Sequence, residues 1–214
     1  MSAKVNNAEQ HDRAVDSLTA TLRAFFAASQ TWNVLSHARW QPLSDFPSEC
    51  YTFDAIIVPA GVKLEWDAAR NCFGPDMQPI TVIDVVRKDD IEAEFYDKPD
   101  LLIQSGVYEY CLRDPTAEAL RPPFQAWRLR ESALRPIATC SRGVLFSGAG
   151  FRMDVRGWEI ELSPCGEPRV EEELFTCQRL LDEARGRGQR EQGAIDGLTA
   201  KVESLRAQLT RINP

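Results

Sequence analysis

Residues 80–115 read ITVIDVVRKDDIEAEFYDKPDLLIQSGVYEYCLRDP, and this stretch decides the fold. Its opening, Ile80–Val86, is apolar and β-branched apart from one acid, as in a strand that is buried on both faces. Residues 90–105 carry a helical pattern, and Gly106 follows where a C-terminal cap is expected. Tyr108–Leu112 then has the composition of another strand. A strand, a helix and a strand in this order indicate an α/β domain.

The segments before and after this stretch extend the same pattern. Apolar residues recur at three- and four-residue spacing between Gln10 and Ser29, which predicts an amphipathic helix with one buried face. The sequence predicts one domain, residues 1–168, in which helices flank a mixed sheet. Its further strands are expected at Trp32–Trp40, Thr52–Val58, Phe124–Leu129, Leu134–Thr139 and Trp158–Leu162.

A change of composition marks residues 169–214 as a separate helical segment. From Glu171 onward a heptad repeat can be followed to Ile212, as in a coiled coil, although three glycines weaken its middle. We expect residues 171–212 to join chains into a homo-oligomer. One heptad position holds Leu174, Leu181, Gly188, Ile195, Val202 and Leu209, and the second holds Cys177, Ala184, Glu191, Leu198, Leu205 and Ile212.

Composition places the chain among ordinary globular proteins. A length of 214 residues with 43% hydrophobic and 27% charged residues suits one domain with an appendage and a real core. No apolar run reaches the roughly 18 residues of a membrane-spanning helix, and the start does not resemble a secretion signal, so we expect a cytoplasmic protein. The six cysteines form no CxxC pair, which argues against a zinc knuckle and favours free thiols.

The net charge of −7 means that the surface as a whole does not attract nucleic acid. Any contact with DNA must be local, and basic side chains or a bound divalent cation must supply the positive charge. Arg87 and Lys88, with Arg128 and Arg130 further on, are candidates for phosphate contacts. The competing interpretation, that these are ordinary solvated charges, stays open.

Two acids stand inside apolar strand segments, Asp54 in TFDAIIVP and Asp84 in ITVIDVV. An unpaired charge there is costly, so each acid should meet a metal, a cation or solvent at a strand end. A turn cap at a strand end is the simpler alternative, and it carries more weight for Asp54. Lys98 shares a helical stripe with three apolar residues and should point inward, and Glu94 stands one turn before it.

Two carboxylates and a lysine are the minimal equipment for metal-assisted hydrolysis of a phosphodiester. Asp54 and Asp84 would hold Mg²⁺, or Mn²⁺ in its place, through oxygen ligands. The metal would help to deprotonate a water molecule and stabilise charge on the phosphate, and Lys98 would orient or activate that water.

At these residues the sequence resembles the Uma-two-type endonucleases of the PD-(D/E)xK superfamily. That family has an acid in an apolar "PDvvv" strand, an "IEVlS" strand, a helix with a lysine and a closing "GVpEYWlvDP" element. Asp54 matches the first acid, Asp84 the second and Lys98 the helix lysine, and Gly106–Pro115 (GVYEYCLRDP) matches the closing element. The resemblance implies a restriction-endonuclease-like fold, dependence on Mg²⁺ and DNA as the substrate.

The resemblance is weaker at the N-terminus and has departures in its centre. The opening helix is similar to a family helix in which an acid or a histidine approaches the metal, so Glu9 and His11 are auxiliary candidates, with a plain surface histidine as the alternative. Pro99 removes a helical hydrogen bond and would place Lys98 at a kink or a helix start. Residues that depart from the family pattern are Phe53 for proline, Asp84 for glutamate, Arg87 for serine, Leu102 for tyrosine and Cys111 for tryptophan.

Three hypotheses follow from the sequence. The first is a Mg²⁺-dependent DNA endonuclease that is oligomeric through its C-terminal helix. The second is a catalytically impaired nuclease homologue that acts as an oligomeric DNA- or protein-binding module, which the departures at Pro99 and Arg87 favour. The third is a coiled-coil interaction protein in which the globular part has kept only the fold.

Overall fold

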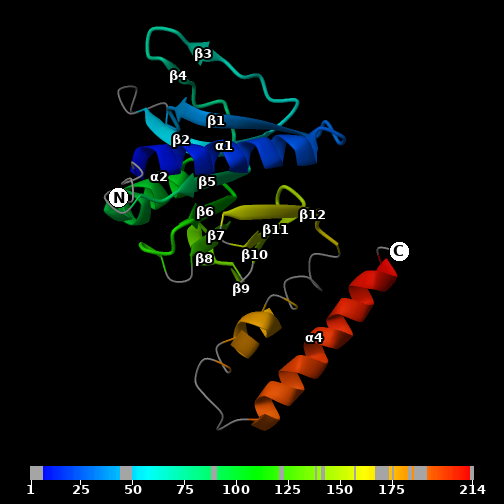
Figure 1. Ribbon diagram of the computed structural model, residues 1–214. Coiled ribbons are helices and arrows are strands. Elements are labelled where there is room, and N and C mark those ends of the chain that lie inside the picture. Colours follow the sequence, from blue (N-terminus) through cyan, green and yellow to red (C-terminus); the bar gives the residue numbers. More distant parts are fainter. Residues whose placement is uncertain are drawn as a thin grey trace.

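Two β-sheets with flanking helices build the fold (Figure 1). The computed structural model describes residues 7–43, 50–87, 91–120, 123–137, 139–140, 143–156, 158–166, 174, 176–182, 185 and 192–212. The helices are α1 (Asn7–Phe26), the π-helical turn η1 (Ala93–Asp97), α2 (Lys98–Gln104) and α4 (Gln192–Ile212). The strands are β1 (Trp32–Trp40), β2 (Tyr51–Pro59), β3 (Trp66–Asp67), β4 (Cys72–Phe73), β5 (Thr81–Val85), β6 (Glu109–Arg113), β7 (Phe124–Arg130), β8 (Ala133–Pro136), β9 (Thr139–Cys140), β10 (Gly143–Phe146), β11 (Phe151–Arg156) and β12 (Glu159–Pro164).

The larger sheet has eight strands in the order β3-β4-β1-β2-β5-β6-β7-β8, and the smaller has four in the order β12-β11-β10-β9. β5 runs parallel to β6 and β1 parallel to β4, whereas β1–β2, β2–β5, β6–β7 and β7–β8 are antiparallel. β5 is buried along its whole length, as its apolar sequence predicted. The predicted α/β class, with a mixed sheet flanked by helices and a helix near the C-terminus, is confirmed.

The two faces of the larger sheet bury different cores. On one face, Val15, Leu18 and Leu22 of α1 pack against the sheet, together with residues of β10 and β11 from the smaller sheet. On the other face, Leu101 and Leu102 of α2 belong to a second core. The apolar residues whose spacing predicted the first helix therefore form the face that α1 buries.

The helical segment between β5 and β6 is confirmed, with a widened turn at its start. Pro99 has no amide hydrogen for the bond to the residue four positions earlier, and the turn before it, η1, is π-helical. Lys98 begins α2 with Pro99 in the first turn, where a proline costs little. Lys98 thus lies where the π-helical turn passes into α2, which agrees with the expected kink or helix start. Phe95 and Leu102, from the predicted stripe, pack in the core of this face.

The sequence predictions missed the strands β10 and β11. β10 is the short segment GVLF, and β11 alternates apolar residues with charged ones in FRMDVR. They pair with each other and with β9 and β12, the strands directly before and after them in the sequence. The strand predicted at 134–139 is divided into β8 and β9.

The heptad residues of the C-terminal segment pack against one another within the chain. Leu174, Cys177, Val202 and Leu205 form a small core of their own, with Leu209 against it. Figure 1 shows the helical residues 176–182 beside α4. Of the predicted heptad positions, Ala184, Gly188 and Glu191 lie outside the described residues. In the part of the chain that is described, no helix is both long and apolar enough to cross a membrane.

A buried ion pair lies within the larger sheet on the α1 face, and its arginine also donates to the Leu145 carbonyl of the smaller sheet. Glu109 is fully buried, and the guanidinium of Arg128 lies 3.0 Å from its Oε1. The carboxylate also accepts the Thr81 hydroxyl at 3.1 Å and the Gly148 amide at 3.2 Å. Arg128, which the sequence offered for phosphate contact, is only 2% exposed, so that prediction is wrong. Because this part of β7 is buried, Arg128 pairs with Glu109 inside the fold.

Replacing Arg128 by alanine should destabilise the protein by about 3–5 kcal/mol, because Glu109 would be left buried without its cation. Urea unfolding followed by circular dichroism measures the change. Arg135 is exposed and lies opposite Arg128 in the register of β7 with β8. Arg135→Ala is therefore the matched control, and its free energy of unfolding should stay within about 0.5 kcal/mol of the parent value. Equal losses of stability in the two variants would contradict a structural role for the ion pair between Glu109 and Arg128.

Candidate active site

Asp54 and Asp84 lie side by side where the pairing of β2 with β5 ends. The last pair on this side is Ala55 with Ile83, and the same register places Asp54 opposite Asp84. Hydrogen bonds from the backbone to the side chains follow: the Asp54 amide donates to Asp84 Oδ1 over 2.9 Å, and the Val85 amide donates to Asp54 Oδ2 over 2.8 Å. Each carboxylate is therefore fixed by the neighbouring strand.

Lys98 lies between Asp84 and Glu94. Its Nζ donates to Asp84 Oδ2 over 2.9 Å and to Glu94 Oε1 over 2.8 Å. The Tyr110 hydroxyl donates to Glu94 Oε2 over 3.0 Å and lies 3.3 Å from Asp84 Oδ2. The side chains of Lys98 and Glu94 are 13% and 12% exposed, and that of Asp84 is 1% exposed. Solvent therefore reaches the lysine, and Asp84 forms the floor of the cluster.

Two carboxylates, Asp84 and Glu94, contact a single lysine, and Asp54 lies beside Asp84, so that acids outnumber the cation and this imbalance sets the protonation of the cluster. Burial raises the pKa of Asp84 to about 7; Lys98 opposes this rise, and the charges of Glu94 and Asp54 add to it. Although burial lowers the pKa of Lys98, the carboxylates of Asp84 and Glu94 raise it above its usual value. The lysine stays charged, and Asp84 is the carboxylate that takes up a proton near neutral pH.

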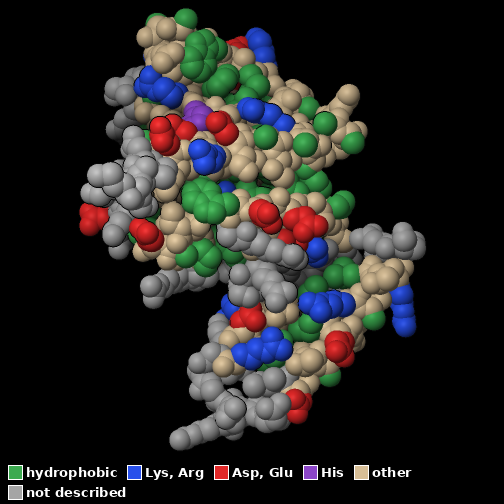
Figure 2. All heavy atoms as spheres, viewed as in Figure 1, with side chains coloured by type: hydrophobic (Ala, Val, Ile, Leu, Met, Phe, Trp, Pro, Cys, Tyr) green, Lys and Arg blue, Asp and Glu red, His purple; other side chains and the backbone are tan. Residues whose placement is uncertain are grey.

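Both histidines of the chain approach Asp54. His11, on α1, has its Nε2 atom 3.2 Å from Asp54 Oδ2. This hydrogen bond raises the pKa of His11, whereas burial and the charge of Arg87 lower it. His37, on β1, has its Nδ1 atom 3.9 Å from Asp54 Oδ1. Figure 2 shows a histidine on the surface with acidic and basic side chains close to it.

The structure brings together most of the residues that the sequence singled out: Asp54, Asp84, Lys98, Glu94 and His11. Glu9 is exposed on α1, and no contact of the described residues joins it to this cluster. Arg87 is exposed close by, and Lys88 lies outside the described residues.

Two members of the cluster were missed. Tyr110 lies in the matched closing element, and the alternation of side chains along β6 could have placed it on the same face as Leu112. His37 had no such signal, because only the register of β1 with β2 brings it to Asp54.

The donor set fits a hard divalent cation. Carboxylate oxygens are the ligands that Mg²⁺ prefers, and the excess of acids attracts a cation. Within the described residues, no three side chains of His, Cys, Asp or Glu gather in a way that could hold a metal. Mg²⁺ does not require such a group, because it usually keeps several waters and takes one or two carboxylates together with substrate phosphate. Asp54 and Asp84 would be the two carboxylates if such a cation bound here.

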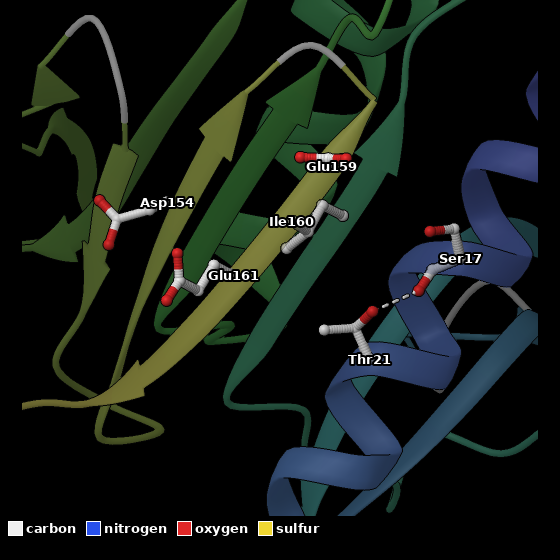
Figure 3. Close-up of a pocket in the computed structure, with 6 residues that line it drawn as sticks. All are labelled: Ser17, Thr21, Asp154, Glu159, Ile160 and Glu161. Atoms are coloured by element: carbon white, nitrogen blue, oxygen red, sulfur yellow. Dashed lines mark hydrogen bonds between the residues drawn. The ribbon is translucent and has the colours of Figure 1, made fainter.

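A separate acidic hollow lies between α1 and the strands β11 and β12 (Figure 3), with a volume of 380 Å³. Asp154 is paired with Arg152 there at 2.8 Å, and the Thr21 hydroxyl donates to the Ser17 carbonyl. The lining residues are Ser17, Thr21, Asp154, Glu159, Ile160 and Glu161, with no basic side chain among them. Such a lining repels phosphate, so this hollow is a poorer site for nucleic acid than the cluster around Lys98.

Comparisons with known proteins leave the family open. No protein-family model matches the chain, and no curated protein sequence matches it. Among solved structures, the chain is similar to one described as "a putative nuclease belonging to DUF820" from Anabaena variabilis, with 9% identity and a TM-score of 0.47 over 63% of this chain and 70% of that chain. At this level of likeness the comparison supports no statement about the site, whose chemistry follows from its own residues.

The raised pKa of Asp84 predicts a stability that falls as the pH rises. The folded protein keeps a proton on Asp84 up to about pH 7, whereas the unfolded chain loses it near the ordinary value of 3.8. The contribution of Asp84 to the free energy of unfolding should therefore decrease between about pH 4 and pH 7 and then level off, and Asp84→Asn should show a smaller decrease than the parent over this range.

Urea unfolding at a series of pH values measures this difference, with Asp76→Asn at an exposed acid as the control. Parent and Asp84→Asn curves that run parallel across this range would show that Asp84 ionises in the folded state as it does in the unfolded chain.

Proposed function

We propose that this protein is a metal-dependent nuclease that hydrolyses phosphodiester bonds of DNA. The observation that carries this proposal is the convergence of Asp54, Asp84 and Lys98, with the amine 2.9 Å from one acid and the two acids on adjacent strands. Burying charged groups together costs free energy of folding, so stability alone gives little reason for this cluster. Carboxylates with a shifted pKa beside a lysine are typical of catalytic sites.

Each residue has a distinct task in the proposed reaction. Asp54 and Asp84 would hold Mg²⁺ or Mn²⁺, which when bound stabilises negative charge on the phosphate and lowers the pKa of water. Lys98 keeps its proton and can orient the attacking water or bind a phosphate oxygen. Glu94 and Tyr110 fix the position of the lysine amine through Glu94 Oε1 and Oε2. His11 orients Asp54 from the side of α1.

Because the protein is negatively charged overall, its attraction for DNA must come from a local site. The chain carries a net charge of −7, so DNA is repelled at long range. A divalent cation between the two acids would turn the cluster into an attractive point for phosphate, and the exposed Arg87 would add to it. We expect binding to weaken steeply as the salt concentration rises.

One observation favours a second function, that of a catalytically impaired homologue which binds DNA or a protein partner. Both oxygens of Asp84 already accept protein donors: Oδ1 from the Asp54 amide and Oδ2 from Lys98. If this network holds Asp84 too tightly for a metal, DNA would bind without being cut. Cleavage of DNA by the parent protein separates the two functions.

Self-association through residues 171–212 is a further proposal. A nuclease that cuts both strands of a duplex gains from two sites in one particle. The apolar seam expected to join chains contributes to a core within one chain, at Leu174, Val202 and Leu205. A dimer would therefore use other surfaces of this segment, and sedimentation of the full chain against a chain shortened before Glu171 tests it.

Asp54→Asn, Asp84→Asn and Lys98→Met should each lower DNA cleavage about a hundredfold or more, because each removes a charge that the reaction uses. Supercoiled plasmid and linear DNA are incubated with the protein and Mg²⁺ or Mn²⁺, and the products are quantified on gels. The parent should cut with either metal and stop when EDTA is added.

Glu161→Gln, at an exposed acid of the other hollow, and Lys63→Met, at a lysine whose side chain is 85% exposed, are matched controls that should keep the parent activity. Equal cleavage by all variants would point to a contaminating nuclease or to another site. DNA binding without cleavage by the parent would favour the impaired homologue.

A further inference from the structure

His37 occupies a strained position in line with the two acids. Its φ is 47°, in the left-handed region that disfavours side chains with a Cβ atom. β1 pairs with β2 on both sides of His37, and the same register puts His37 opposite Asp54. His37, Asp54 and Asp84 therefore lie on three neighbouring strands in one row across the sheet, and regular backbone pairing is interrupted at this row.

Core packing does not explain why a histidine stands there. The side chain of His37 is 43% exposed and is not part of the hydrophobic cores on the two faces of the sheet. Glycine or asparagine would adopt this backbone conformation more easily. Strained residues of this kind gather at functional sites, where the side chain is needed in that place.

Holding Asp54 does not explain it either. Asp54 Oδ2 accepts the Val85 amide and lies 3.2 Å from Nε2 of His11, whose side chain is only 12% exposed. His37 lies on the side of Oδ1, and its 3.9 Å separation is too long for a hydrogen bond. The two histidines thus differ in role. His11 is hydrogen-bonded to the Asp54 carboxylate, whereas the ring of His37 lies beside this carboxylate and is exposed to solvent.

We propose that His37 is a substrate-contacting residue, whose imidazole N–H donates a hydrogen bond to the phosphodiester that lies over Asp54 and Asp84. The proposal rests on the nuclease function proposed above. The ring nitrogen that does not face Asp54 is the donor, and Lys98 lies beside Asp84 at the other end of the row. Because a phosphate oxygen carries no sequence information, this contact should be the same for every DNA sequence.

Two substitutions separate this role from a structural one. His37→Gly relieves the backbone strain and removes the ring, and His37→Asn tolerates the left-handed conformation with a shorter side chain. Both should fold with unchanged or higher thermal stability, and both should raise the KM for cleavage of a short DNA duplex about tenfold or more, since hydrogen bonds to charged groups are strong. Gln30→Gly, at an exposed residue with φ 51°, is the matched control and should gain stability without changing KM.

Proton NMR of the imidazole signals provides a readout that does not depend on catalysis. The chain has only two histidines, so loss of one signal in His37→Asn assigns both. Addition of a short DNA duplex to the parent with Ca²⁺ present should shift the His37 signal more than the His11 signal, and both shifts should be smaller when EDTA replaces Ca²⁺.

The outcomes distinguish this inference from the proposed function. If the parent cuts DNA, while the His37 signal does not move and His37→Gly keeps the parent KM, the inference is overturned and the nuclease stands. If the parent never cuts DNA but the His37 signal shifts and His37→Gly binds the duplex about tenfold more weakly, the phosphate contact is supported and the nuclease fails. A loss of thermal stability in both variants with KM unchanged would assign His37 a structural role.

Discussion

The structure depends on the point where backbone pairing between β2 and β5 gives way to Asp54 and Asp84. A carboxylate that is fully buried, as Asp84 is, costs several kcal/mol unless donors surround it. Here the donors are the Asp54 amide and the amine of Lys98, with the Tyr110 hydroxyl within reach. The strand order, the π-helical turn and the helix start at Lys98 all serve to bring these groups together.

Each face of the larger sheet holds an ion pair between a carboxylate and a basic side chain, and the two ion pairs differ in role. On the α1 face, Glu109 and Arg128 are almost completely buried and saturated by neighbours from both sheets, which suits a fixed structural contact. On the α2 face, the side chain of Lys98 stays 13% exposed and its acids outnumber it. A pair that solvent can reach and that carries excess negative charge can exchange ligands. Chemistry is therefore expected on the second face.

Local patterns in the sequence were sufficient for the elements that bury a continuous apolar stripe or run, such as α1 and β5, and for two acids whose burial needed a cation. They were sufficient for Lys98 too, including the irregularity of the helix beside it, because Pro99 restricts the backbone in a known way. They failed where the outcome depended on contacts between separate segments: the burial of Arg128 and the approach of His37 to Asp54. The strands β10 and β11 pair with their neighbours in the sequence, and the alternation of apolar and charged residues in FRMDVR was a local signal for β11 that the predictions overlooked. The heptad residues likewise predicted an apolar seam correctly but not that both sides of it come from one chain.

The central claim is that a divalent cation binds between Asp54 and Asp84, and crystals of the protein soaked in Mn²⁺ test it most directly. An anomalous-difference peak within coordination distance of both carboxylates is the expected result. A peak only in the hollow lined by Asp154, Glu159 and Glu161, or no peak at any of these acids, would contradict it.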